Sequence, residues 1–131
     1  MVICTPSDEN ETRKLLTTAY LHNGPASVRY PRGTGPNSNV DKDLKPLKIG
    51  EANIINEESS EIVILNFGTL LNEANQISKE LRATLVDMRF VKPLDEKLLR
   101  KLFKKAKVFI SIEDGSICLL YTSDAADDLI G

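Results

Sequence analysis

The apolar residues of the chain fall into short continuous runs that alternate with helical stripes. Four of the runs predict strands, at 48–55, 61–67, 84–90 and 108–112. The run at 61–67 is nearly unbroken, which is typical of a parallel strand covered on both faces. Apolar side chains spaced by three and four predict helices at 70–81 and 95–106, with Thr69 and Asp95 as their N-caps. Such alternation indicates an α/β/α domain with a mostly parallel sheet and right-handed crossovers.

A shorter unit precedes this domain. The apolar run at 2–4 predicts the end of a buried strand, and Ser7 is the expected N-cap of a helix with an acidic first turn. A second strand is predicted over 27–32. It ends in two arginines and a tyrosine, just before the turn at Gly33. We therefore expect this strand to deliver cations to the edge of a sheet.

Turn-forming residues separate the two units. Gly, Pro, Asn and Ser dominate the stretch after Gly33, and apolar residues are almost absent from it. The expected organisation is a unit over 1–36, an interdomain linker over 37–47 and a second domain that starts at 48.

Composition narrows the class of protein. The chain of 131 residues has a formal net charge of −2, which gives no reason to expect a nucleic-acid partner. No apolar run approaches the about 20 residues that span a bilayer, and the start lacks the pattern of a secretory signal, so we expect no membrane contact. Cys4 and Cys118 are expected to be reduced thiols of a cytoplasmic protein. A single histidine, His22, cannot form a metal cluster alone.

The residues by themselves do not reveal a reaction. The sequence has no dinucleotide-binding or phosphate-binding glycine loop and no nucleophile elbow. Glu113 and Asp114 end a predicted parallel strand, where α/β folds place ligand sites, although acidic strand ends also serve as caps or face solvent. Lysines are concentrated at the end of the last predicted helix, at positions 101, 104, 105 and 107. Cations are favourable at a helix C-terminus and on a solvated helix face, so this run does not by itself indicate a binding site.

Four segments of the sequence read TPSDENET at 5–12, GP followed by VRYPRG within 24–33, ILNFGT at 64–69, and LVDMRFVKPLD at 85–95. In this order and at this spacing, they resemble the C-terminal part of the 1-deoxy-D-xylulose-5-phosphate synthase family of the transketolase class. The resemblance covers residues 1 to about 117. It implies the end of a pyrimidine-binding domain over 1–36 and an incomplete transketolase C-terminal domain over 48–117.

The resemblance also implies an activity. The family enzyme is a homodimer that condenses pyruvate with glyceraldehyde 3-phosphate to 1-deoxy-D-xylulose 5-phosphate, a precursor of isoprenoids, thiamine and pyridoxal. It uses thiamine diphosphate and Mg²⁺, whose ligands and catalytic residues have no counterparts here, so we expect this fragment to be inactive alone. Arg32 matches the family arginine that binds the substrate phosphate, a role that suits a guanidinium. Tyr30 shares its predicted strand face and is a possible support, whereas Arg29 faces the other side and is expected to be structural.

The chain departs from the family at both ends. Met1 aligns with an interior position, so we expect the chain to begin in mid-protein. Residues 118–131 do not follow the family and resemble translated adapter sequence, which leads to the hypothesis that this tail is artefactual. Two alternatives remain open at this point. One is a fragment of a two-oxoacid dehydrogenase β-subunit, which binds no phosphorylated acceptor, and the other is a free-standing binding domain.

Overall fold

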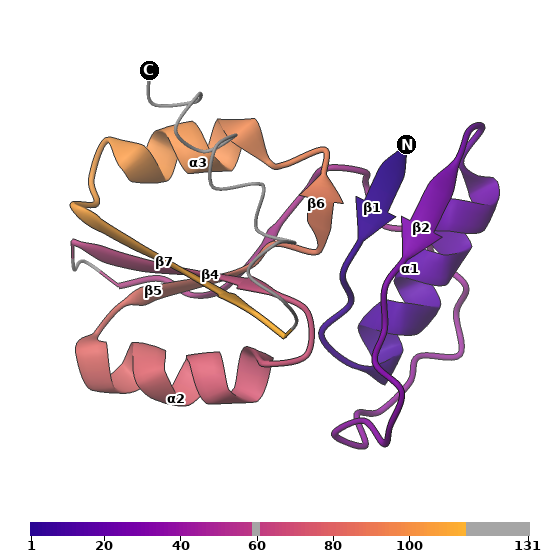
Figure 1. The fold of residues 1–131 in the computed structure, drawn as a ribbon, viewed down its shortest axis with the longest axis horizontal. Helices are drawn as coiled ribbons and strands as arrows, with labels where there is room; N and C mark the ends of the chain where they lie inside the picture. The colour runs from indigo at the N-terminus through magenta and orange to yellow at the C-terminus, as the bar shows by residue number, and fades with distance from the viewer. Residues whose placement is uncertain (59–60, 115–131) are drawn as a thin grey trace.

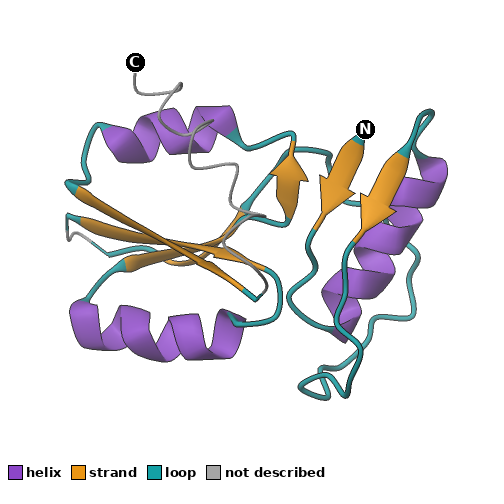
Figure 2. Cartoon of the chain, viewed as in Figure 1, coloured by secondary structure: helices purple, strands orange, loops and turns teal. Residues whose placement is uncertain are grey.

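A computed structural model describes residues 1–58 and 61–114, and they form two β-sheets that lie side by side (Figure 1). The larger sheet contains four strands, β3 (Asn53–Asn56), β4 (Ile62–Phe67), β5 (Thr84–Asp87) and β7 (Val108–Glu113). It lies between two helices, α2 (Leu71–Leu81) and α3 (Glu96–Phe103), as Figure 2 shows. The smaller sheet contains β1 (Val2–Cys4), β2 (Ala26–Val28) and β6 (Phe90–Lys92), and its helix is α1 (Glu9–Leu21).

The larger sheet has the order β3-β5-β4-β7. Strand β4 pairs in parallel with both β5 and β7, and only β3 runs antiparallel. The prediction of an α/β fold with a mostly parallel sheet is therefore confirmed.

Alternating side chains along β4 and β5 supply two cores, one on each face of the larger sheet. Val63 and Val86 belong to a cluster that includes Leu99 of α3, whereas Ile64 and Leu85 pack with residues of α2. Neighbouring residues of a strand point to opposite faces, so one apolar run supplies both helix contacts. This packing explains why the strongest apolar runs of the sequence became the central strands.

The predicted strand over 84–90 is wrong as a single element. Strand β5 ends at Asp87, and Arg89 adopts a left-handed conformation with φ of 60°. The chain then turns into β6, which pairs antiparallel with β1 of the other sheet, and Phe90 is fully buried against Cys4 and Leu15. The second unit thus contributes one strand to the sheet of the first unit.

The predicted strand over 27–32 is also too long. Strand β2 ends at Val28, because its partner β1 has only three residues. The amide of Arg29 still donates a hydrogen bond to the carbonyl of Cys4, the last residue of β1. Pro31 has no amide hydrogen with which to extend the pairing. The strand predicted over 48–55 likewise begins only at Asn53.

The helix starts match the predictions in one case of three. The Asp95 carboxylate accepts a hydrogen bond from the Leu98 amide at 3.0 Å, which confirms it as the N-cap of α3. Helix α1 is capped by Asp8 and not by Ser7, whose hydroxyl is used elsewhere. Helix α2 follows Leu70 without any side-chain cap, so the expectation for Thr69 is wrong. None of the three helices in the described ranges has the length and apolar character that crossing a membrane requires.

Candidate functional site

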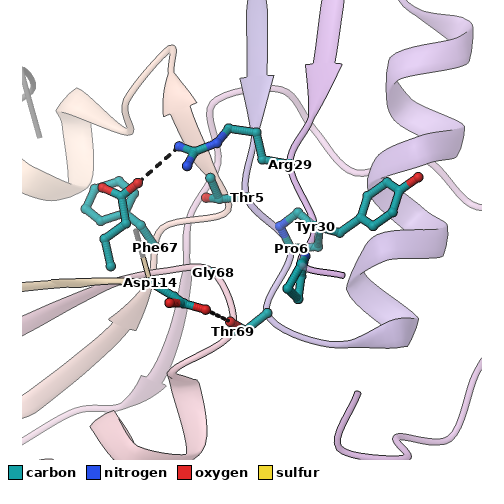
Figure 3. A pocket seen from close by; sticks show the side chains of 10 residues that line it. Thr5, Pro6, Arg29, Tyr30, Phe67, Gly68, Thr69 and Asp114 are labelled. Carbon is teal, nitrogen blue, oxygen red and sulfur yellow. Dashed lines mark hydrogen bonds and ion pairs between the residues drawn. The ribbon is translucent and has the colours of Figure 1, made fainter. Parts of the chain in front are cut away.

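A cavity of about 200 Å³ lies where the two sheets meet, at the carboxyl ends of their strands (Figure 3). Residues that directly follow β1, β2 and β4 line it, together with the end of β7. This is the edge at which α/β folds commonly place ligands. The lining residues are Thr5, Pro6, Arg29, Tyr30, Pro31, Phe67, Gly68, Thr69, Glu113 and Asp114.

An ion pair closes one side of the cavity. Arg29 Nη1 donates a hydrogen bond to Glu113 Oε1 at 3.0 Å, and the Glu113 side chain is only 6% exposed. In Figure 3 a dashed line from the Arg29 guanidinium marks this contact. The contact joins the two sheets, which agrees with the structural role expected for Arg29. It also gives Glu113 a structural partner.

The charges around this cavity do not suit a phosphate. Asp114 accepts a long hydrogen bond of 3.4 Å from the Thr69 hydroxyl and adds a second carboxylate to that of Glu113. Among the described residues that line the cavity, two carboxylates therefore face the guanidinium of Arg29 alone, which already has an acidic partner. A dianion placed there would be repelled more than it is attracted.

Arg32 does not line this cavity, and Tyr30 lines it without turning its ring toward the charged residues. Arg32 is exposed, does not line the cavity, and makes no hydrogen bond or ion pair with any residue that the structure describes. Tyr30 is 63% exposed, and Figure 3 shows its ring directed away from Arg29 and Asp114. Because β2 ends at Val28, no strand places Tyr30 and Arg32 on one face, so both assignments stay predictions.

The stretch predicted as a linker is fastened to α1. Glu9 accepts hydrogen bonds from the amides of Asn37 and Ser38 at 2.8 and 3.2 Å, and Lys14 pairs with Asp41 at 3.0 Å. Backbone hydrogen bonds, first that of its own amide, lower the pKa of Glu9. The Lys14 ammonium does the same for the pKa of Asp41. These contacts require polar partners about 30 positions apart, which the composition of the stretch does not reveal.

A second feature that sequence reasoning missed is a buried polar cluster between the sheets. Asp87 is 1% exposed, and its Oδ2 accepts a hydrogen bond of 2.7 Å from the Ser7 hydroxyl. Beside it, the Arg89 guanidinium donates two hydrogen bonds of 2.9 Å to the Glu11 carboxylate. Burial raises the pKa of Asp87 to about 7, since removal from water disfavours the carboxylate. Both contacts link segments nearly 80 residues apart.

The part of the chain that the structure describes contains no set of side chains arranged to bind a metal ion. No group of three or more His, Cys, Asp or Glu side chains is arranged there to hold an ion. Lys107, from the basic run, pairs with Glu61 at 2.8 Å, and both side chains are largely exposed. Cys118 and the expected tail over 118–131 lie outside the described residues.

Comparison with known proteins finds one matching domain family, a set of similar enzymes of one name, and a solved structure of similar fold. The transketolase C-terminal domain family matches residues 50–120. The 1-deoxy-D-xylulose-5-phosphate synthases of Pseudomonas fluorescens Pf0-1 and Stutzerimonas stutzeri A1501 are each 51% identical over 117 residues. That alignment covers 89% of this chain but only 18% of each relative. A solved structure called split gene transketolase, inactive beta4 tetramer, has a TM-score of 0.72 at 23% identity and covers 89% of this chain and 40% of its own.

These matches agree with the fold and with the family motifs. The likeness to the solved structure supports the fold alone, because its identity is low. The sequence matches extend from the smaller unit through the larger sheet. The chain therefore belongs to the transketolase C-terminal domain family, and it corresponds to the C-terminal part of 1-deoxy-D-xylulose-5-phosphate synthase.

Proposed function

We propose that this chain is the carboxy-terminal segment of a homodimeric synthase that condenses pyruvate with glyceraldehyde 3-phosphate to 1-deoxy-D-xylulose 5-phosphate. The observation that carries the proposal is the 51% identity over 117 residues to synthases of that name. The product would supply isoprenoid, thiamine and pyridoxal synthesis. The chain spans about 18% of the length of these relatives, so the reaction belongs to the whole protein.

Within that protein, Arg32 is the residue that we assign to the phosphate of glyceraldehyde 3-phosphate. Its guanidinium has no acidic partner among the described residues, whereas Arg29 is already paired with Glu113. An unpaired guanidinium is able to make two parallel charge-assisted hydrogen bonds to phosphate oxygens. Tyr30, two residues earlier and exposed, is the proposed support for Arg32.

Thiamine diphosphate and Mg²⁺ would be bound by other parts of the parent enzyme. We assign neither group to this segment and route no step through them. This segment would bind the phosphorylated acceptor and hold the larger domain against the smaller unit. We accordingly propose that the chain on its own does not turn over either substrate.

A chimaera tests the proposal directly. The matching 117-residue segment of the Pseudomonas fluorescens synthase would be replaced by the segment of this chain that aligns with it. The expected result is a dimeric enzyme that still forms 1-deoxy-D-xylulose 5-phosphate from both substrates. A chimaera that folds, dimerises and binds thiamine diphosphate but forms no product would contradict the proposed function.

A further inference from the structure

Asp87 occupies an unusual position for a carboxylate. It ends β5, is 1% exposed, and lies at the junction of the two sheets. The Ser7 hydroxyl, from the segment between β1 and α1, donates to its Oδ2 at 2.7 Å. The Asn66 amide, from β4, lies 3.5 Å from Oδ1 and donates its good hydrogen bond of 2.8 Å to the Gly68 carbonyl instead. One strong hydrogen bond therefore holds a nearly fully buried carboxylate.

The charges that face Asp87 nearly cancel each other. Glu11 of α1 opposes its ionisation and Arg89 favours it, but these two side chains are bonded to each other at 2.9 Å. The residue paired with Asp87 on β3 is Asn53, which is uncharged, and β4 presents the amide of Asn66. No described cation forms an ion pair with Asp87 itself, and burial is the largest influence on its pKa.

Asn66 supplies a second observation. Its Oδ1 is buried and has no hydrogen-bond partner among the described residues, although its amide nitrogen is bonded. A buried acceptor without a donor is costly. A carboxyl group that carries a proton is a donor, whereas a carboxylate only accepts. A neutral Asp87 adds one hydroxyl donor to a junction that contains this unpaired acceptor, although the Asn66 group that faces Asp87 is its amide nitrogen, at 3.5 Å.

We propose that Asp87 is a proton-dependent latch that holds the smaller sheet and α1 against the larger sheet. Its neutral carboxyl group keeps the Ser7 contact at no cost in buried charge. Its carboxylate weakens the junction, because the charge is then buried without a cation in contact. The attachment of β1 to β6 accordingly loosens as the pH rises toward neutrality.

The direction in which stability changes with pH follows from proton linkage. The pKa of Asp87 in the folded chain, about 7, lies above the value of 3.8 for an unperturbed Asp. The folded state thus binds more protons than the unfolded state between these values, and stability falls as the pH rises through that window. Above a pH of about 7 the loss is complete.

Hydrogen exchange at the junction is the test. The Thr5 amide donates to the Arg89 carbonyl at 2.7 Å and reports the contact between the two units. After correction for intrinsic exchange, its protection factor should fall with rising pH, by up to about tenfold per pH unit, the limit for release of one proton. In Asp87→Asn, which carries no titrating proton, the protection factor should be independent of pH between 5.5 and 8.

Matched variants separate the effect of Asp87 from a general effect of pH on the chain. His22→Gln, which replaces the single histidine of the sequence, serves as the control and should keep the wild-type dependence. Ser7→Ala removes the donor to the carboxylate and should move the inflection to higher pH. Equal pH dependence in the wild type and in Asp87→Asn would overturn the proposal.

A second measurement does not depend on how a variant folds. The carboxyl ¹³C resonance of Asp87 in the wild-type chain should titrate with a midpoint near neutrality. A midpoint near 4, the ordinary value for an Asp, would overturn the latch whatever the variants show.

Discussion

The Glu11–Arg89 pair allows a quantitative prediction about the junction between the two sheets. Two hydrogen bonds of 2.9 Å join the side chains, which are only 12% and 15% exposed. Glu11→Gln leaves the guanidinium with one neutral acceptor in a site with little water. Removal of one partner from a buried pair costs about 3–5 kcal/mol, and the acceptor that Gln retains reduces this to about 2–3 kcal/mol.

The assay is urea unfolding of the 131-residue chain, followed by circular dichroism. The control is Glu96→Gln, which removes a partner of Arg100 from a pair at 3.8 Å whose side chains are 63% and 61% exposed. Exposed pairs contribute little, so the control should lose less than about 0.5 kcal/mol. Equal losses in the two variants would refute the reasoning, because burial would then have no effect on the value of the pair.

Two further predictions follow from the burial of Leu85 and Cys4, and a third from the short length of the chain relative to the synthases. Leu85→Ala should lose about 2–5 kcal/mol in urea unfolding because Leu85 is fully buried, and Ile54→Ala, at a 37% exposed position, should lose much less. Burial raises the pKa of the Cys4 thiol to about 11, so mass spectrometry should show Cys4 alkylated far more slowly in the native chain than in urea at pH 8, and similar rates would contradict its burial. The chain incubated with pyruvate, glyceraldehyde 3-phosphate, thiamine diphosphate and Mg²⁺ should form no product, and detectable 1-deoxy-D-xylulose 5-phosphate would refute that expectation.

Periodicity was sufficient to predict the elements of the larger domain. The apolar run over 61–67 and the stripe before Ala106 became a central strand and a covering helix, with Asp95 as the cap of that helix. Local signals were less reliable where two candidates stood together. Ser7 and Asp8 are both good caps, and Asp8 took the role while Ser7 bonded to a residue 80 positions away.

The partition of the run over 84–90 was beyond sequence reasoning. Its residues are apolar enough for one strand, but Phe90 is buried in the smaller core and not in the larger one. That choice depends on β1, which lies more than 80 positions earlier and offers a free edge to β6. The cavity could not be predicted from the sequence for the same reason, because Arg29 pairs with Glu113, which lies 84 positions away. Arg32 could be assigned only through the family motif.

The central claim is that this segment binds the phosphorylated acceptor, and the kinetics of Arg32→Ala in the chimaeric synthase test it most directly. Arg32→Ala should cause a large increase in KM for glyceraldehyde 3-phosphate and little change in KM for pyruvate, because only the acceptor carries a phosphate. Arg100→Ala, at a 63% exposed position, should leave both values unchanged. Equal effects of Arg32→Ala on the two substrates, or no effect on either, would contradict the claim.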